Sequence, residues 1–122
     1  MIINSNKNII VLYPSTTVNG IVYSLSGNTV SQVTTLGTKS STRLTKTSDF
    51  SANGNYFIVA NTTSAIKAYS VSGTTFTELT APTTQPSATI QTCAISVNGI
   101  MAVSSSVSPY LYFYYNNSGT IT

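Results

Sequence analysis

The sequence predicts an all-β protein made of three tandem copies of one repeat of about 46 residues. Two observations lead to this fold class. Turn residues and aromatic residues recur at a nearly constant interval along the chain, and the apolar runs between them are short and rich in Val, Ile, Tyr, Phe and Thr. None of these runs has the length or the periodicity of a helix. Four short strands fit into each repeat.

The repeat is clearest between the second and third copies. Residues 51–60 read Ser-Ala-Asn-Gly-Asn-Tyr-Phe-Ile-Val-Ala, and residues 96–103 read Ser-Val-Asn-Gly-Ile-Met-Ala-Val. Asn53 and Asn98 lie 45 positions apart within this match. The interval is close to that expected for a tandem β-repeat, which predicts that the two segments occupy the same place in neighbouring structural units.

A first, more diverged copy opens the chain. Gly27, Gly73 and Gly119 follow one another at intervals of 46 positions. One tyrosine of each copy falls into register with these glycines, namely Tyr23, Tyr69 and Tyr114. We expect such repeat-register aromatic residues, and Phe57 with them, to be buried between the units.

Within the central copy we expect strands at about 42–50, 55–61, 65–71 and 74–80. The Asn53-Gly54 and Asn98-Gly99 pairs are expected to supply the positive φ angles that a tight hairpin turn requires. The Ser72-Gly73 and Ser118-Gly119 pairs mark a second turn in the same two copies.

Four antiparallel strands in about 45 residues make up one blade of a β-propeller. The chain then forms a single β-propeller-like domain, 1–122, with blades at about 1–37, 41–80 and 88–122. Single-chain propellers close at about four to eight blades, so three blades are expected to remain open. A second chain would complete a six-bladed ring, which favours a homodimer. The alternative is an incomplete propeller that packs onto a larger surface.

Two motifs give the chain a resemblance to known families. Residues 50–60, Phe-Ser-Ala-Asn-Gly-Asn-Tyr-Phe-Ile-Val-Ala, resemble a turn of WD40-like propeller repeats. Residues 72–79 and 108–114 are similar to propeller-like repeats of tailed-phage and prophage proteins, mostly virion or tail components. The chain contains neither a Trp-Asp dipeptide nor any His, so it departs from the WD40 pattern and fits the phage-type repeat better. This resemblance implies a propeller fold and a place in a virion.

Composition narrows the partners. Charged residues make up 6% of the chain and Ser and Thr about a third, so its surface is polar but carries few charges. The net charge of +3 comes from too few basic groups to indicate nucleic-acid binding. Lys39, Arg43 and Lys46 lie close together in the sequence and are a candidate anion patch, although a solvated strand or loop is the favoured explanation.

The single cysteine, Cys93, excludes an intramolecular disulfide, and its neighbours favour a small buried hydrophobic residue. The cellular location is predicted from the N-terminus and from the apolar runs. Residues 1–7 do not read as a signal peptide, and no apolar run is long enough for a membrane span. The expected location is the virion if the protein is viral, and otherwise the cytoplasm.

Catalysis is not expected. The chain has no His, one Asp and one Glu, and general acid–base chemistry needs titratable groups held close together. Asp49 and Glu78 fall on different strands of one repeat, where turn support and surface charge are the simpler roles. Two carboxylates supply too few ligands for a metal, and no Gly-rich phosphate loop is present. We therefore expect no cofactor.

The segment Tyr110-Leu111-Tyr112-Phe113-Tyr114-Tyr115 is the candidate site. Strand alternation sends Tyr110, Tyr112 and Tyr114 to one face and the other three side chains to the opposite face. Packing between blades is the structural explanation. The functional alternative is a flat aromatic surface that stacks on sugar rings with help from the amides of Asn116 and Asn117. The same residues would form an assembly interface if this blade met the first blade of a partner chain.

Two functions follow from these features. The first is a structural or interaction module of a phage-like particle, such as a decoration, head-fibre or tail-associated protein that works by oligomerising and by binding other virion proteins. The second is a carbohydrate-binding propeller, a lectin-like module that binds a receptor. A scaffold protein inside the cell is a third reading with no sequence feature of its own.

Overall fold

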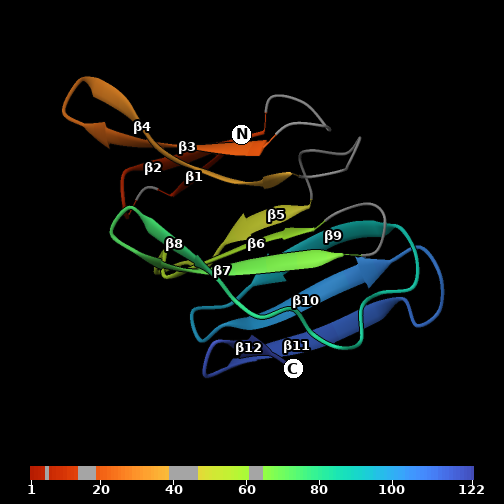
Figure 1. Ribbon diagram of the computed structural model, residues 1–122. Coiled ribbons are helices and arrows are strands. Elements are labelled where there is room, and N and C mark those ends of the chain that lie inside the picture. Colours follow the sequence, from red (N-terminus) through yellow and green to blue (C-terminus); the bar gives the residue numbers. More distant parts are fainter. Residues whose placement is uncertain (5, 14–18, 39–46, 61–64) are drawn as a thin grey trace.

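The polypeptide folds into three four-stranded antiparallel sheets (Figure 1). The computed structural model describes residues 1–4, 6–13, 19–38, 47–60 and 65–122. Each sheet is a meander in which strands consecutive in the chain pair with each other. No helix occurs among the described residues, so the predicted all-β class with three four-stranded units is confirmed.

We call the sheets blades 1, 2 and 3. Blade 1 consists of β1 (Ile2–Asn4), β2 (Ile9–Leu12), β3 (Asn19–Ser26) and β4 (Thr29–Thr38). Blade 2 consists of β5 (Ser48–Phe50), β6 (Tyr56–Ala60), β7 (Ile66–Ser72) and β8 (Thr75–Glu78). Blade 3 consists of β9 (Ile90–Ile95), β10 (Ile100–Ser105), β11 (Leu111–Asn117) and β12 (Thr120–Ile121). The central strands lie close to the expected ranges, except that residues 42–46 of the first expected strand are outside the described part of the chain.

The blades stack face to face in chain order, as Figure 1 shows, and their first strands β1, β5 and β9 lie next to one another. This is how successive blades are arranged in a propeller. We call the two faces of a blade its N-face and its C-face. The N-face is the side on which the preceding blade packs in blades 2 and 3, and the C-face is the side on which the following blade packs in blades 1 and 2.

Two apolar cores fill the spaces between the blades. In the first, Ile9, Val11 and Val22 of the C-face of blade 1 pack against the N-face of blade 2, which contributes Phe57 and Tyr69. In the second, the C-face of blade 2 packs against the N-face of blade 3. Its buried members are Ile58, Ala60, Ile66, Ala68, Leu79, Ile90, Cys93, Ile95, Met101, Val103, Tyr114 and Ile121. The expected burial of Phe57, Tyr69 and Cys93 is thereby confirmed.

One backbone hydrogen bond recurs in all three blades and defines their common register. The N–H groups of Leu25, Val71 and Asn116, two residues after the repeat tyrosines, donate to the carbonyls of Asn8, Asn55 and Gly99. The three tyrosines therefore occupy equivalent positions, as the sequence predicts. Blades 2 and 3 bury Tyr69 and Tyr114, whereas Tyr23 on the N-face of blade 1 is only half-buried.

The first turn of each blade is closed between its first and fourth residues. Gly54 N–H donates to Ser51 in blade 2, and Gly99 N–H donates to Ser96 in blade 3. In these two turns positive φ falls on the glycines, at 72° for Gly54 and 78° for Gly99, whereas in the first turn of blade 1 it falls on Asn8, at 51°. The expected positive φ at the Asn53-Gly54 and Asn98-Gly99 pairs is therefore confirmed at their glycines, and the Oδ1 atom of Asn53 accepts a further hydrogen bond from Asn55 N–H.

Candidate functional site

Strand β11 separates its side chains as the alternation predicts. Tyr114 is buried and Tyr112 half-buried on the N-face of blade 3, toward blade 2. Tyr110 precedes β11 and is 67% exposed. Packing between blades therefore explains the face of β11 that carries Tyr112 and Tyr114. It does not explain the opposite face, where Leu111, Phe113 and Tyr115 are exposed in the described part of the chain.

Aromatic rings and an asparagine side chain make the contacts on the buried side of β11. The rings of Tyr112 and Tyr114 are parallel within 3°, with centroids 6.3 Å apart. The Asn116 Nδ2 group donates to the hydroxyl of Tyr56 in blade 2, at 3.5 Å, while its Oδ1 atom accepts from Gly119 N–H at 2.9 Å. Asn116 thus links blade 3 to blade 2, and Asn117 next to it is exposed.

The C-face of blade 3 is an open apolar surface. Phe113 is 67% exposed and Tyr115 is 55% exposed. Across the sheet Phe113 is paired with Ala102 and Tyr115 with Ile100, and Ala102 is paired in turn with Ala94. Together with Leu111, these residues form a continuous surface over β9, β10 and β11 that carries no charge. Exposed apolar surfaces of this kind mark interaction sites.

An asparagine joins each pair of neighbouring blades at the first turn. The Nδ2 group of Asn6 in blade 1 donates to the carbonyl of Ala52 in blade 2. In the same way Asn53 Nδ2 donates to the carbonyl of Val97 in blade 3, at 3.3 Å. In both cases the third residue of one turn donates to the second residue of the next. Asn98 is the third residue of the blade 3 turn, and it is exposed.

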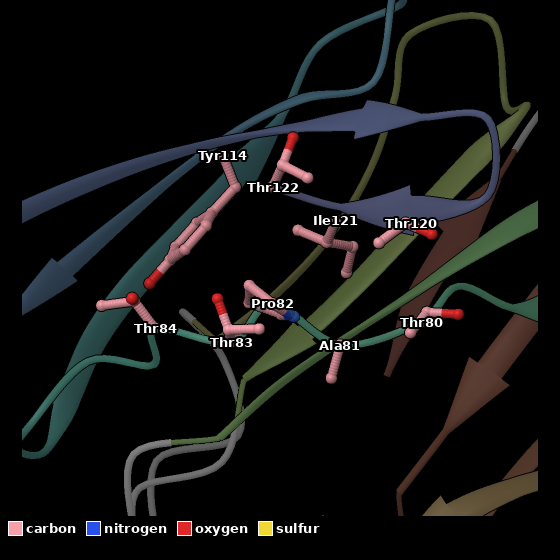
Figure 2. A pocket seen from close by; sticks show the side chains of 9 residues that line it. All are labelled: Thr80, Ala81, Pro82, Thr83, Thr84, Tyr114, Thr120, Ile121 and Thr122. Carbon is pink, nitrogen blue, oxygen red and sulfur yellow. The ribbon is translucent and has the colours of Figure 1, made fainter.

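A small pocket lies where the connection between blades 2 and 3 passes the outer strand β12 (Figure 2). Thr80 N–H donates to the Gly119 carbonyl at 2.8 Å, and Ile121 N–H donates to the Thr80 carbonyl at 2.9 Å. These bonds hold residues 80–84 along β12 and leave a cavity of about 290 Å³. It is lined by Thr80, Ala81, Pro82, Thr83, Thr84, Tyr114, Thr120, Ile121 and Thr122.

The Tyr114 ring reaches from β11 toward residues 80–84 in this pocket, as Figure 2 shows. Its hydroxyl is buried and has no hydrogen-bond partner among the described residues. Burial raises the pKa of the Tyr114 phenol above its ordinary value, and the neighbouring Tyr112 raises it further. A buried hydroxyl without a partner is an uncommon feature in a folded protein. The pocket therefore combines threonine hydroxyls with an apolar lining, and the Tyr114 ring contributes a buried hydroxyl that lacks a partner among the described residues.

The remaining candidate residues are placed apart or fall outside the described chain. Lys39, Arg43 and Lys46 lie outside the described residues. Asp49 Oδ2 accepts from Ile95 N–H of blade 3 at 3.1 Å. Glu78 forms an exposed ion pair with Lys67 at 2.8 Å. In the described ranges no three His, Cys, Asp or Glu residues gather in a way that could hold a metal ion. No helix that is long and apolar enough to cross a membrane occurs in these ranges.

Sequence reasoning missed the pocket and the junction role of the asparagines. The signal for the pocket was the run Thr-Ala-Pro-Thr-Thr at 80–84, which read only as a connection between repeats. The signal for the junction was the recurrence of asparagine at the third turn position, at Asn6, Asn53 and Asn98. From the sequence, Asn53 and Asn98 are interpreted only as turn residues, and Asn6 is given no separate role.

The fold and these surfaces define a class, a propeller-like repeat protein whose described residues form three blades and leave the C-face of blade 3 open. No protein-family model, curated protein or solved structure matches the chain. The fold class therefore stands on the sheets and their stacking, and function has to be argued from the surfaces themselves.

Proposed function

We propose that this chain is a non-catalytic assembly module, a structural protein of a phage-like virion that works through protein–protein contacts. The observation that carries the proposal is the open C-face of blade 3, because Phe113 and Tyr115 expose more than half of their surface on an uncharged sheet face. Aromatic residues are enriched in the centres of protein interfaces. The resemblance of residues 72–79 and 108–114 to phage-type repeats supports a place in the virion as a decoration, head-fibre or tail-associated protein.

The placement of the acidic groups supports a non-catalytic role. Asp49 is engaged with the backbone of the next blade, and Glu78 is engaged with Lys67 at an exposed edge. Acid–base catalysis requires groups that converge on one reacting atom. These two carboxylates have separate partners on separate strands.

Particle incorporation tests the proposal. Particles from cells that produce the chain are purified on a density gradient, and the chain is quantified against the other particle proteins by mass spectrometry. A fixed copy number that survives repeated purification is expected. Loss of the chain to the soluble fraction at the first gradient would refute a structural role in the virion.

A carbohydrate-binding propeller is the second candidate, and the pocket at β12 favours it. Sugar rings are bound by hydroxyl groups beside an apolar or aromatic surface, and the pocket is lined by threonine hydroxyls together with the Tyr114 ring, Pro82 and Ile121. Glycan-array screening followed by calorimetry with the best sugar tests this candidate. Binding that disappears in a Thr84→Val variant would support it, and the absence of binding at millimolar sugar would exclude it.

A further inference from the structure

We infer that the open C-face of blade 3 docks the N-face of blade 1 of a second copy of this chain. The inference rests on the proposed assembly function and names its first partner. Two such contacts join two chains head to tail into one six-bladed ring, in which every blade face is covered. The argument uses the shared register of the three blades.

The N-face of blade 1 is open at the positions that are covered in the other blades. Ile3, Ile10 and Tyr23 form one row across β1, β2 and β3. The corresponding row of blade 3, Ile95, Met101 and Tyr114, is buried against blade 2. In blade 1 the same row leaves Ile3 57% exposed and the other two side chains half-buried. The N-face of blade 1 therefore has the apolar residues of a face that packs against a neighbouring blade, and no described blade covers it.

The C-face of blade 3 is open in the complementary way. By the shared register, Phe113 corresponds to Val22 of blade 1 and Ala68 of blade 2, and both of these residues are fully buried against the following blade. Ile100 corresponds to Ile9, which is also fully buried, yet Ile100 is 51% exposed. The chain thus carries one open N-face and one open C-face, and both internal junctions consist of a C-face on an N-face.

The new contact is a variant of the internal junctions rather than a copy of them. Phe113 and Tyr115 are larger than the residues at their equivalent positions, whereas Ala102 is smaller than its counterparts Val11 and Ile58. The bulk of the C-face is therefore shifted from β10 toward β11. Among the described residues the side chains named on the two open faces are uncharged, so burying these side chains together removes apolar area from water without leaving an ion unpaired.

Asn98 supplies a second, independent sign of a blade that follows. In Asn53 the Oδ1 atom accepts from Asn55 N–H and serves the turn, while Nδ2 donates across the junction to Val97. Asn6 also donates across its junction. Asn98 occupies the same turn position at the edge of the open C-face. In the ring its Nδ2 group would donate to the first turn of the second copy.

Light scattering on the wild-type chain and on two single variants tests the docking. Phe113→Glu places a charge on the C-face and Ile3→Glu places one on the N-face. The wild-type chain is expected as a dimer, and each variant as a folded monomer whose dissociation constant is raised at least about 100-fold. Val107→Glu, in the loop between β10 and β11, is the matched control and is expected to remain dimeric. Far-UV circular dichroism confirms that each variant is folded.

Mixing the two variants distinguishes the head-to-tail geometry from any other. The Phe113→Glu chain keeps an intact N-face and the Ile3→Glu chain keeps an intact C-face, so the mixture is expected to form a heterodimer through one interface. Asn98→Asp keeps a side-chain oxygen at this position but loses the amide donor, and is expected to weaken the dimer at least about 5-fold.

Three results would overturn the docking. They are a wild-type monomer at about 100 µM chain, a dimer that persists in the Ile3→Glu variant, and a mixture of the two variants that stays monomeric. The proposed virion role is tested separately by particle incorporation. A monomer that is found in particles at fixed copy number would refute the docking and leave the virion role intact.

Discussion

Replacing Phe57 by alanine is expected to remove a large part of the stability of the fold. The ring is fully buried between blades 1 and 2. Its centroid lies 4.6 Å from that of Phe50, 6.0 Å from Phe76 and 6.2 Å from Tyr69. A buried Phe→Ala substitution costs about 3–5 kcal/mol, and loss of aromatic contacts places Phe57 in the upper half of that range. Domains are stable by roughly 5–15 kcal/mol, so the melting temperature should fall by more than about 10 °C.

The matched control for this substitution is Phe113→Ala, at the exposed position of β11. Both variants are made in the Ile3→Glu background, so that self-association does not contribute to the comparison. Urea unfolding is followed by tyrosine fluorescence and circular dichroism. Phe113→Ala is expected to cost less than about 1 kcal/mol. A cost below about 1 kcal/mol for Phe57→Ala, or equal costs for the two variants, would refute the packing of blades on one another.

Three further predictions concern single contacts. Gly54→Val should lower the melting temperature by at least about 5 °C, because the residue has a φ of 72° and a Cβ atom there would lie 2.4 Å from the side chain of Asn4; calorimetry showing no change would argue against this turn. Tyr114→Phe should be neutral or stabilising by up to about 1 kcal/mol in urea unfolding, because the lost hydroxyl has no partner among the described residues. Since folding raises the pKa of the phenol, ionisation of Tyr114 favours the unfolded chain, so this group leaves stability unchanged below about pH 10 and lowers it as the pH rises through the folded pKa. The wild-type chain should therefore lose stability more steeply than Tyr114→Phe above that pH. A double-mutant cycle on the exposed pair of Lys67 and Glu78 should give a coupling below about 1 kcal/mol, and a larger value would mean that the pair is more shielded from water than its exposure indicates.

The fold could be predicted from the sequence because its signals are local and repeated. A strand of four to seven residues is recognised by its content of Val, Ile and Tyr, and a glycine at a fixed offset indicates the turn that follows the strand. Gly73 and Gly119 mark equivalent hairpins for this reason, and both have positive φ. Copies of one signal at a constant interval reinforce one another, so that even the diverged first copy falls into register at Tyr23.

The candidate site was harder to predict, because exposure is not a local property. Tyr114 and Phe113 are adjacent residues of one strand with the same chemical character, yet one is buried and the other is 67% exposed. Their alternation gives the two faces of the strand, but the presence of a neighbouring blade decides which face is covered. The pocket depends on the path of residues 80–84 along β12, which no periodic pattern encodes.

Repetition also explains why the open faces are able to serve an external contact. A blade buries its faces only against a neighbour, so each internal junction is an interface between units that happen to share one chain. The surface chemistry required of Ile10 or Ile100 is then the same whether the neighbouring blade belongs to this chain or to another. What distinguishes a junction from a solvent-facing edge is the polar contact at the turn. Asn98 is an asparagine at the turn position from which Asn6 and Asn53 make this contact inside the chain. A substitution of Asn98 should therefore weaken the docking of a blade, whereas it should leave nonspecific adhesion of an apolar face unchanged.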